Sequence, residues 1–187
     1  MVRFFLKSTV YLSVIMVFAC IPLSTAPLTF PGEQELDRSL VGTWWHQGDG
    51  ETVYVHIGLD ESSDFFRIVL VDFDQGTELE TSEYLAHTSS LKGNNYLNLK
   101  PLTPRDDWQG YLFVKYTTSS GSFEFSMIES QVIERAIRKG ELAGSVKREE
   151  KVKSVRITAA QEDLQAFVLT HDAELFAENK SLSRVPH

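Results

Sequence analysis

Short apolar runs separated by turn residues extend over most of the chain, and they restrict the possible folds more than any other feature. Within 51–58, apolar and polar residues alternate, so that Val53, Val55 and Ile57 share one face. A period of two residues is typical of a β-strand with one buried face. The run 65–73 is apolar on both faces, which predicts a strand covered on both sides. Further strands are predicted at 40–47, 77–91, 96–100, 110–118, 122–129, 142–150 and 151–158.

Helical spacing replaces this alternation in two places. Segment 130–140 carries apolar residues at helical spacing and ends at Gly140, a common residue just after a helix. Thr158 and Gln161 have the spacing of a capping box, which predicts a second helix near the end of the chain. The predicted fold is mainly β: a single antiparallel meander barrel of eight or nine strands, with one short helix before the last hairpin and a C-terminal helix. Closure into a barrel would remove the exposed strand edges.

The amino terminus has the anatomy of an export signal. Arg3 and Lys7 are followed by the uncharged run 8–19, which ends at Cys20, the only cysteine of the chain. A basic end, a short apolar stretch and a small residue before a cut describe a secretory signal peptide. A membrane-spanning helix needs roughly 20 apolar residues, and Pro22 would interrupt one here. A retained signal anchor and a cleaved, unlipidated protein remain alternative interpretations.

Residues 17–20, Val-Phe-Ala-Cys, resemble the lipobox of bacterial lipoproteins. The resemblance implies cleavage after Ala19, lipidation of the Cys20 thiol and acylation of the new amino terminus, which together anchor a protein stably. It also implies an exported protein of the bacterial cell envelope, and Ile21 after the cysteine would favour the outer membrane, facing the periplasm. The expected organisation is a signal peptide at 1–19, the lipidated cysteine and a tether at 20–38, and a barrel domain at 39–187.

Gly42 and Trp44 match the Gly-x-Trp motif of the lipocalins, and the predicted meander with a late helix resembles the architecture of that family. The resemblance implies that Trp44 covers the closed end of the barrel and that a cation near the last strand packs across it. Arg156 is the candidate for this cation. The longer pattern over 40–185 resembles a group of uncharacterised bacterial lipoproteins with lipocalin-like barrels, a group that implies no catalytic residue.

Charge restricts the possible partners of the predicted domain. The chain carries a net charge of −8, and the mature part would be near −10, because the predicted signal peptide contains two positive charges. Such acidity argues against a nucleic-acid partner, which would require clustered Lys and Arg. It also argues against a domain that lies flat on anionic lipid, beyond the contact that the anchor imposes. Without a second cysteine, the domain must be stabilised by burial and not by disulfides.

The sequence contains no motif for catalysis, a cofactor or a metal. Its five histidines are scattered without metal-ligand spacing. The predicted function is that of a non-catalytic binding module for a small apolar ligand. The alternative is an interaction or assembly protein of the cell envelope, with a filled barrel. A hydrolase is the least favoured hypothesis. The candidate residues for a ligand pocket or for the barrel end are Trp44, Trp45, Phe66, Phe123, Phe125 and Arg156.

Overall fold

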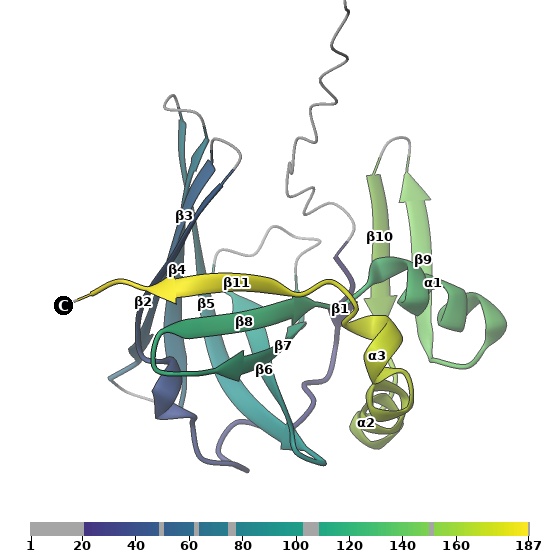
Figure 1. The fold of residues 1–187 in the computed structure, drawn as a ribbon. Helices are drawn as coiled ribbons and strands as arrows, with labels where there is room; N and C mark the ends of the chain where they lie inside the picture. Colours follow the sequence, from purple (N-terminus) through teal and green to yellow (C-terminus); the bar gives the residue numbers. More distant parts are fainter. Residues whose placement is uncertain are drawn as a thin grey trace, which may run out of the picture.

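Eight antiparallel strands close into a barrel in the order β11-β2-β3-β4-β5-β6-β7-β8 (Figure 1). The computed structural model describes residues 21–48, 51–61, 64–74, 78–102, 109–149 and 152–186. The barrel strands are β2 (Gly42–Gly48), β3 (Glu51–Leu59), β4 (Phe66–Asp74), β5 (Glu78–Leu91), β6 (Asn94–Pro101), β7 (Leu112–Thr118), β8 (Ser122–Met127) and β11 (Lys180–Arg184). The predicted fold class, a mainly β protein built on one antiparallel barrel with few helices, is confirmed.

The strand that closes the barrel is not the one that the sequence predicts. Closure depends on β11, which pairs with both β8 and β2. Of its residues only Leu182 is buried and apolar, so β11 has too little alternation to be recognised in the sequence. The predicted last hairpin, β9 (Gly144–Glu149) and β10 (Val152–Ile157), instead lies outside the barrel. It forms a separate three-stranded sheet with β1 (Leu23–Ser24).

Three α-helices lie beside the barrel next to this small sheet: α1 (Ser130–Lys139), α2 (Gln161–Thr170) and α3 (Asp172–Leu175) (Figure 1). The first helix ends as predicted, because the Gly140 N–H bonds to the carbonyls of Ala136 and Ile137. The capping box predicted for the second helix is wrong. Ala160 occupies the N-cap of α2 without a side-chain hydrogen bond, and the Thr158 N–H instead bonds to the Ala143 carbonyl.

Two hydrophobic cores share the barrel wall. The first lies inside the barrel; the second lies between the outer wall, the helices and the small sheet. Tyr96 and Phe113 point outward from β6 and β7 into this second core.

The Tyr96 hydroxyl donates to Asp172 at the start of α3 over 2.6 Å, and Lys115 forms an ion pair with the same carboxylate. Burial, together with the hydrogen bond to Asp172, raises the pKa of Tyr96. Asp172 therefore joins α3 to the barrel.

The described part of the predicted tether is an ordered part of the fold. Leu28 is fully buried in the second core, and its N–H bonds to the Asn98 side chain over 2.7 Å. Nearer the amino terminus, Ser24 exchanges two backbone hydrogen bonds with Tyr111. A methyl group at Gly110 would lie 2.5 Å from the Ser24 carbonyl oxygen, so only glycine allows this approach. The described part of the segment 20–38, which the sequence predicts to be a tether, thus packs against the domain from Ile21 onward, because its apolar residues are buried in the two cores.

The predicted signal peptide and Cys20 lie outside the described residues. Within the described ranges, no helix has the length and apolar character needed to cross a membrane.

Replacing Leu28 with alanine should lower the free energy of unfolding by about 2–5 kcal/mol, because the substitution empties a fully buried site. Urea denaturation monitored by tryptophan fluorescence measures the change. Phe30→Ala, two residues away and 51% exposed, is the matched control and should cost far less. Equal, small effects of both substitutions would mean that this segment does not contribute to the fold.

Candidate functional site

Trp44 forms the closed end of the barrel. Its side chain is fully buried, and the indole N–H donates to the Leu40 carbonyl over 2.8 Å. The guanidinium of Arg184 lies over the ring, 4.7 Å from the centroid. It donates to the Val41 carbonyl over 2.7 Å and to the Ser39 carbonyl over 3.3 Å. One arginine thus joins the last barrel strand to the short 3₁₀ helix η2 (Arg38–Leu40) that precedes the first.

The arrangement around Arg184 explains why the residue at position 42 is glycine. Its φ of +147° is a conformation that other residues rarely adopt, and a methyl group there would lie 3.1 Å from an Arg184 nitrogen. The Gly-x-Trp motif therefore provides a backbone bend with room for the arginine, followed two residues later by the ring that the arginine covers.

The cation over Trp44 is Arg184 and not Arg156, the candidate from the sequence. Arg156 lies in β10, outside the barrel, where its guanidinium donates to the Gln109 carbonyl over 2.9 Å. The difference follows from the topology. Because β11 and not β10 is the last barrel strand, the cation beside β2 comes from β11.

The inward-pointing aromatic residues occupy the half of the barrel next to the closed end. Phe66 is 0% and Phe123 4% exposed. The Phe123 ring lies 5.6 Å from Trp44 and 5.7 Å from Phe125, centroid to centroid, and 6.1 Å from Tyr116. The structure thus brings four of the six predicted residues together in one core: Trp44, Phe66 and Phe123 are buried in it, and Phe125, which is partly buried, packs against it.

Asp37 holds η2 against this filled end. Its carboxylate accepts the Ser39 N–H over 3.0 Å and the Tyr116 hydroxyl over 3.0 Å. Burial and the neighbouring Asp37 raise the pKa of Tyr116, so the phenol stays protonated and keeps donating. Thr88 completes the attachment by accepting the Asp37 N–H over 3.3 Å and donating to the Glu35 carbonyl over 3.2 Å.

Trp45, the sixth predicted residue, points outward and belongs to an apolar patch on the barrel exterior. It lies opposite Tyr54, which lies opposite Val71 on the next strand. Phe73 lies opposite Leu79 and packs edge-on against Tyr54, with 6.1 Å between the ring centroids. Phe73 is 42% and Leu79 59% exposed. We call these five residues the outer-wall patch. Exposed apolar side chains that form a contiguous patch often mark a contact surface.

The inward face becomes polar toward the other end of the barrel. His46, Val53, Asp72 and Glu80 form one row across four strands. One oxygen of Asp72 is buried without a hydrogen-bond partner among the described groups. Within the described residues, histidine, cysteine and carboxylate side chains form no group of three or more placed to hold a metal.

A solvent-open cleft of about 910 Å³ lies between the segment before η2 and the β3–β4 loop. Its charged lining is mostly acidic: Glu33, Glu35, Asp37, Asp60, Glu61 and Asp64, with Arg38 as the one cation. These charges oppose an anionic ligand, and among the described residues that line the cleft there is no nucleophile with a neighbouring base.

His87 fixes the amino-terminal segment to the outer wall. The side chain is buried, and its Nε2–H donates to the Thr29 carbonyl over 2.7 Å. The other ring nitrogen is buried without a partner among the described groups, and the imidazole packs edge-on with Phe65 and with Tyr111. Burial lowers the pKa of His87, against the opposing effects of the Thr29 hydrogen bond and of Glu33. No sequence pattern marks this residue, because its partners are distant in the chain.

The described histidines do not converge on one site. His56 shares a hydrogen bond of 2.9 Å with Thr43 on the barrel exterior, and His171 packs on Phe167 at 4.5 Å between ring centroids. The arrangement thus offers two surfaces for binding, the outer-wall patch and the inward face beyond the aromatic core.

Comparison with known proteins identifies no relative of this chain. No family model, no curated protein and no solved structure matches the chain.

Replacing Arg184 with glutamine should lower the free energy of unfolding by about 2–4 kcal/mol, since it removes a cation–π contact and two hydrogen bonds from a charged donor. Urea unfolding measures the loss. Lys180→Gln, in the same strand but exposed, is the matched control and should change stability little. An Arg184→Gln protein as stable as the wild type would contradict the role of this contact in closing the barrel.

Acidification should destabilise the protein through His87. Its folded-state pKa lies below the ordinary value of 6.5, so the unfolded chain binds the proton more readily. Stability should fall as the pH drops below about 6.5, by at most about 1.4 kcal/mol per pH unit from this group, and level off below the folded-state pKa. Urea unfolding between about pH 8 and pH 5 measures the slope.

His87→Gln should flatten this slope, whereas His56→Gln, on the exposed face of β3, should leave it unchanged. A slope of equal size in all three proteins would assign the pH dependence to other groups.

Proposed function

We propose that the protein is a lipid-anchored, non-catalytic binding protein of the bacterial cell envelope, which engages a partner through the exterior of a filled barrel. The observation that carries this proposal is the burial of Trp44, Phe66 and Phe123 inside the barrel. A closed eight-stranded barrel is a fold that suits a binding module. When its interior is occupied by its own side chains, the contact surface has to lie elsewhere.

The outer-wall patch supplies such a surface. Tyr54 and Phe73 present aromatic rings that pack edge-on against each other, and Leu79 extends the apolar area to the neighbouring strand. Rigid aromatic side chains on a sheet contribute contact area with little loss of conformational entropy, which is why they are enriched at interfaces. An envelope protein with a complementary apolar surface is therefore the proposed partner.

The lipid anchor is supported by the lipobox-like residues 17–20 and by the order of the chain that follows. Cys20 precedes Ile21, which already packs against the barrel core. A lipid on this thiol would hold the domain close to one membrane and restrict its search for partners to that surface.

A small apolar ligand in the open half of the barrel is the second candidate. Two inward-facing apolar side chains there, Leu99 and Met127, are only partly buried, and so is Phe125 at the edge of the aromatic core. These residues give a ligand apolar contact area without displacement of the buried aromatic core.

Photo-cross-linking in living cells tests the main proposal. A photoreactive phenylalanine at Leu79, in the outer-wall patch, should yield a discrete cross-linked product, because this side chain is 59% exposed in an apolar surface. The same group at Lys92, on the β5–β6 turn, is the matched control and should yield none. Phe73→Ser should abolish the product at position 79 without unfolding the protein. Equal products at both positions, or none at either, would contradict a partner site on this wall.

Titration with 1-anilinonaphthalene separates the two candidates. The wild-type protein should show no saturable one-to-one binding if its interior is filled, whereas Phe123→Ala should gain such binding because it opens an apolar cavity. Saturable binding by the wild type, lost in Phe125→Ser but kept in Phe73→Ser, would favour the small-ligand function.

A further inference from the structure

Positive charge is concentrated in one continuous part of this acidic chain. Segment 130–157, which contains α1, β9 and β10, carries eight basic and four acidic residues, a net charge of +4. The whole chain carries −8, so the remaining residues together carry −12. This separation gives the molecule a basic side and an acidic remainder, which orients it in the field of a charged surface.

The basic segment lies beside the start of the described chain. Strand β1 runs parallel to β10 and pairs with its last two residues: Leu23 lies opposite Arg156 and Ser24 opposite Ile157, at the end of β10 that is farther from the β9–β10 turn (Figure 1). Cys20 lies three residues before Leu23. Three residues span at most about 11 Å, so a lipid on Cys20 would begin within that distance of the Leu23–Arg156 pair. The packed amino-terminal segment leaves no long linker to separate the hairpin from the bilayer.

The exposed cations of the hairpin are Lys147 and Arg148, whose side chains point to opposite faces of the hairpin. Neither forms an ion pair with another described residue, so both remain open to an external anion. The turn contains Glu149 and Glu150, which offset part of this charge, and Lys151, which adds to it.

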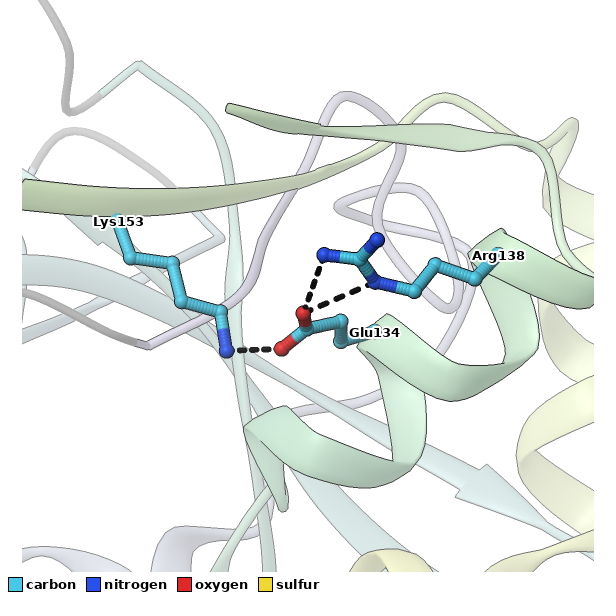
Figure 2. Close-up of polar contacts among 3 residues, drawn as sticks. All are labelled: Glu134, Arg138 and Lys153. Atoms are coloured by element: carbon cyan, nitrogen blue, oxygen red, sulfur yellow. Dashed lines mark hydrogen bonds and ion pairs between the residues drawn. The ribbon is translucent and has the colours of Figure 1, made fainter. Parts of the chain in front are cut away.

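Glu134 fixes the hairpin to α1. Its carboxylate forms an ion pair with Lys153 of β10 and also accepts two hydrogen bonds from Arg138 on its own helix (Figure 2). The hydrogen bond from Lys153, followed by that from Arg138, lowers the pKa of Glu134, so the link persists at neutral pH. The hairpin is therefore held in a defined direction while Lys147 and Arg148 stay exposed.

We infer that the β9–β10 hairpin docks through Lys147 and Arg148 on the anionic headgroups of the membrane that holds the lipid anchor. This inference rests on the anchor of the proposed function and adds an orientation to it. The basic hairpin turns toward the bilayer and the acidic remainder is repelled from it. Local charge thus reverses the expectation, drawn from net charge, that the domain avoids anionic lipid. The barrel then presents its outer-wall patch in a fixed orientation to neighbouring proteins.

The full-length protein, reconstituted in phosphatidylcholine vesicles with or without phosphatidylglycerol, tests the inference. Lipidation blocks the only native thiol, so Ser154→Cys places a single fluorescent label on the hairpin, and Ser119→Cys places one on the distant β7–β8 turn as the matched control. Lipids spin-labelled at the headgroup should quench the label at position 154 at least twofold more than that at 119, and only in the anionic vesicles.

Charge reversal identifies the residues responsible. K147E/R148E should abolish the preferential quenching, and so should about 0.5 M salt, because screening weakens exposed charge contacts. K92E/K180E makes the same change of charge at exposed sites outside the hairpin and should leave the quenching intact. Equal quenching at positions 154 and 119 in anionic vesicles, or quenching that survives K147E/R148E, would overturn the inference.

The mass of the purified protein separates this inference from the proposed function. A mass without acyl chains on Cys20 would refute the anchor, and the protein released from the membrane would then be mixed with phosphatidylglycerol vesicles at low salt. Co-sedimentation that weakens about fivefold for each cation neutralised, in Lys147→Gln and in Arg148→Gln, would still support headgroup docking. The absence of any co-sedimentation would overturn it.

Discussion

The contact between Arg184 and Trp44 is the interaction on which the barrel depends. The indole lies under the guanidinium, and carbonyls of the preceding 3₁₀ helix and of Val41, which follows it, accept the N–H groups of both side chains. A sheet of successive hairpins has two free edges, and this barrel removes them by bringing the last strand beside the first. Arg184 stabilises that junction from inside, since it belongs to β11 and contacts the segment that leads into β2.

The filled closed end has a functional consequence. Trp44 and Phe123 are buried among the core side chains at this end, so the proposed binding surfaces are the open half of the barrel and its exterior. The exterior is itself divided. The helices and the small sheet cover the wall at β6 and β7, whereas the outer-wall patch on β2–β5 remains partly exposed.

The amino-terminal segment connects these features to the proposed anchor. From Ile21 it packs successively against the barrel core, β10, the outer wall and the closed end. A lipid attached to such a packed segment would be held at a fixed place relative to the domain, whereas a flexible tether would let the domain tumble. With the proposed anchor, the placement of the basic hairpin beside this segment would make membrane orientation a property of the fold.

By itself the sequence determined the fold class, because alternation in strands such as β3 depends only on neighbouring residues. It also selected Trp44, Phe66 and Phe123 as candidates for a ligand pocket or the barrel end, and the structure buries all three in the barrel core. The tertiary structure alone decided which strand closes the barrel, which arginine covers Trp44, and that the proline-rich segment is ordered. Each of these depends on contacts between residues far apart in the chain, such as Leu28 with Asn98 or Arg184 with Val41, and local periodicity contains no information about such contacts.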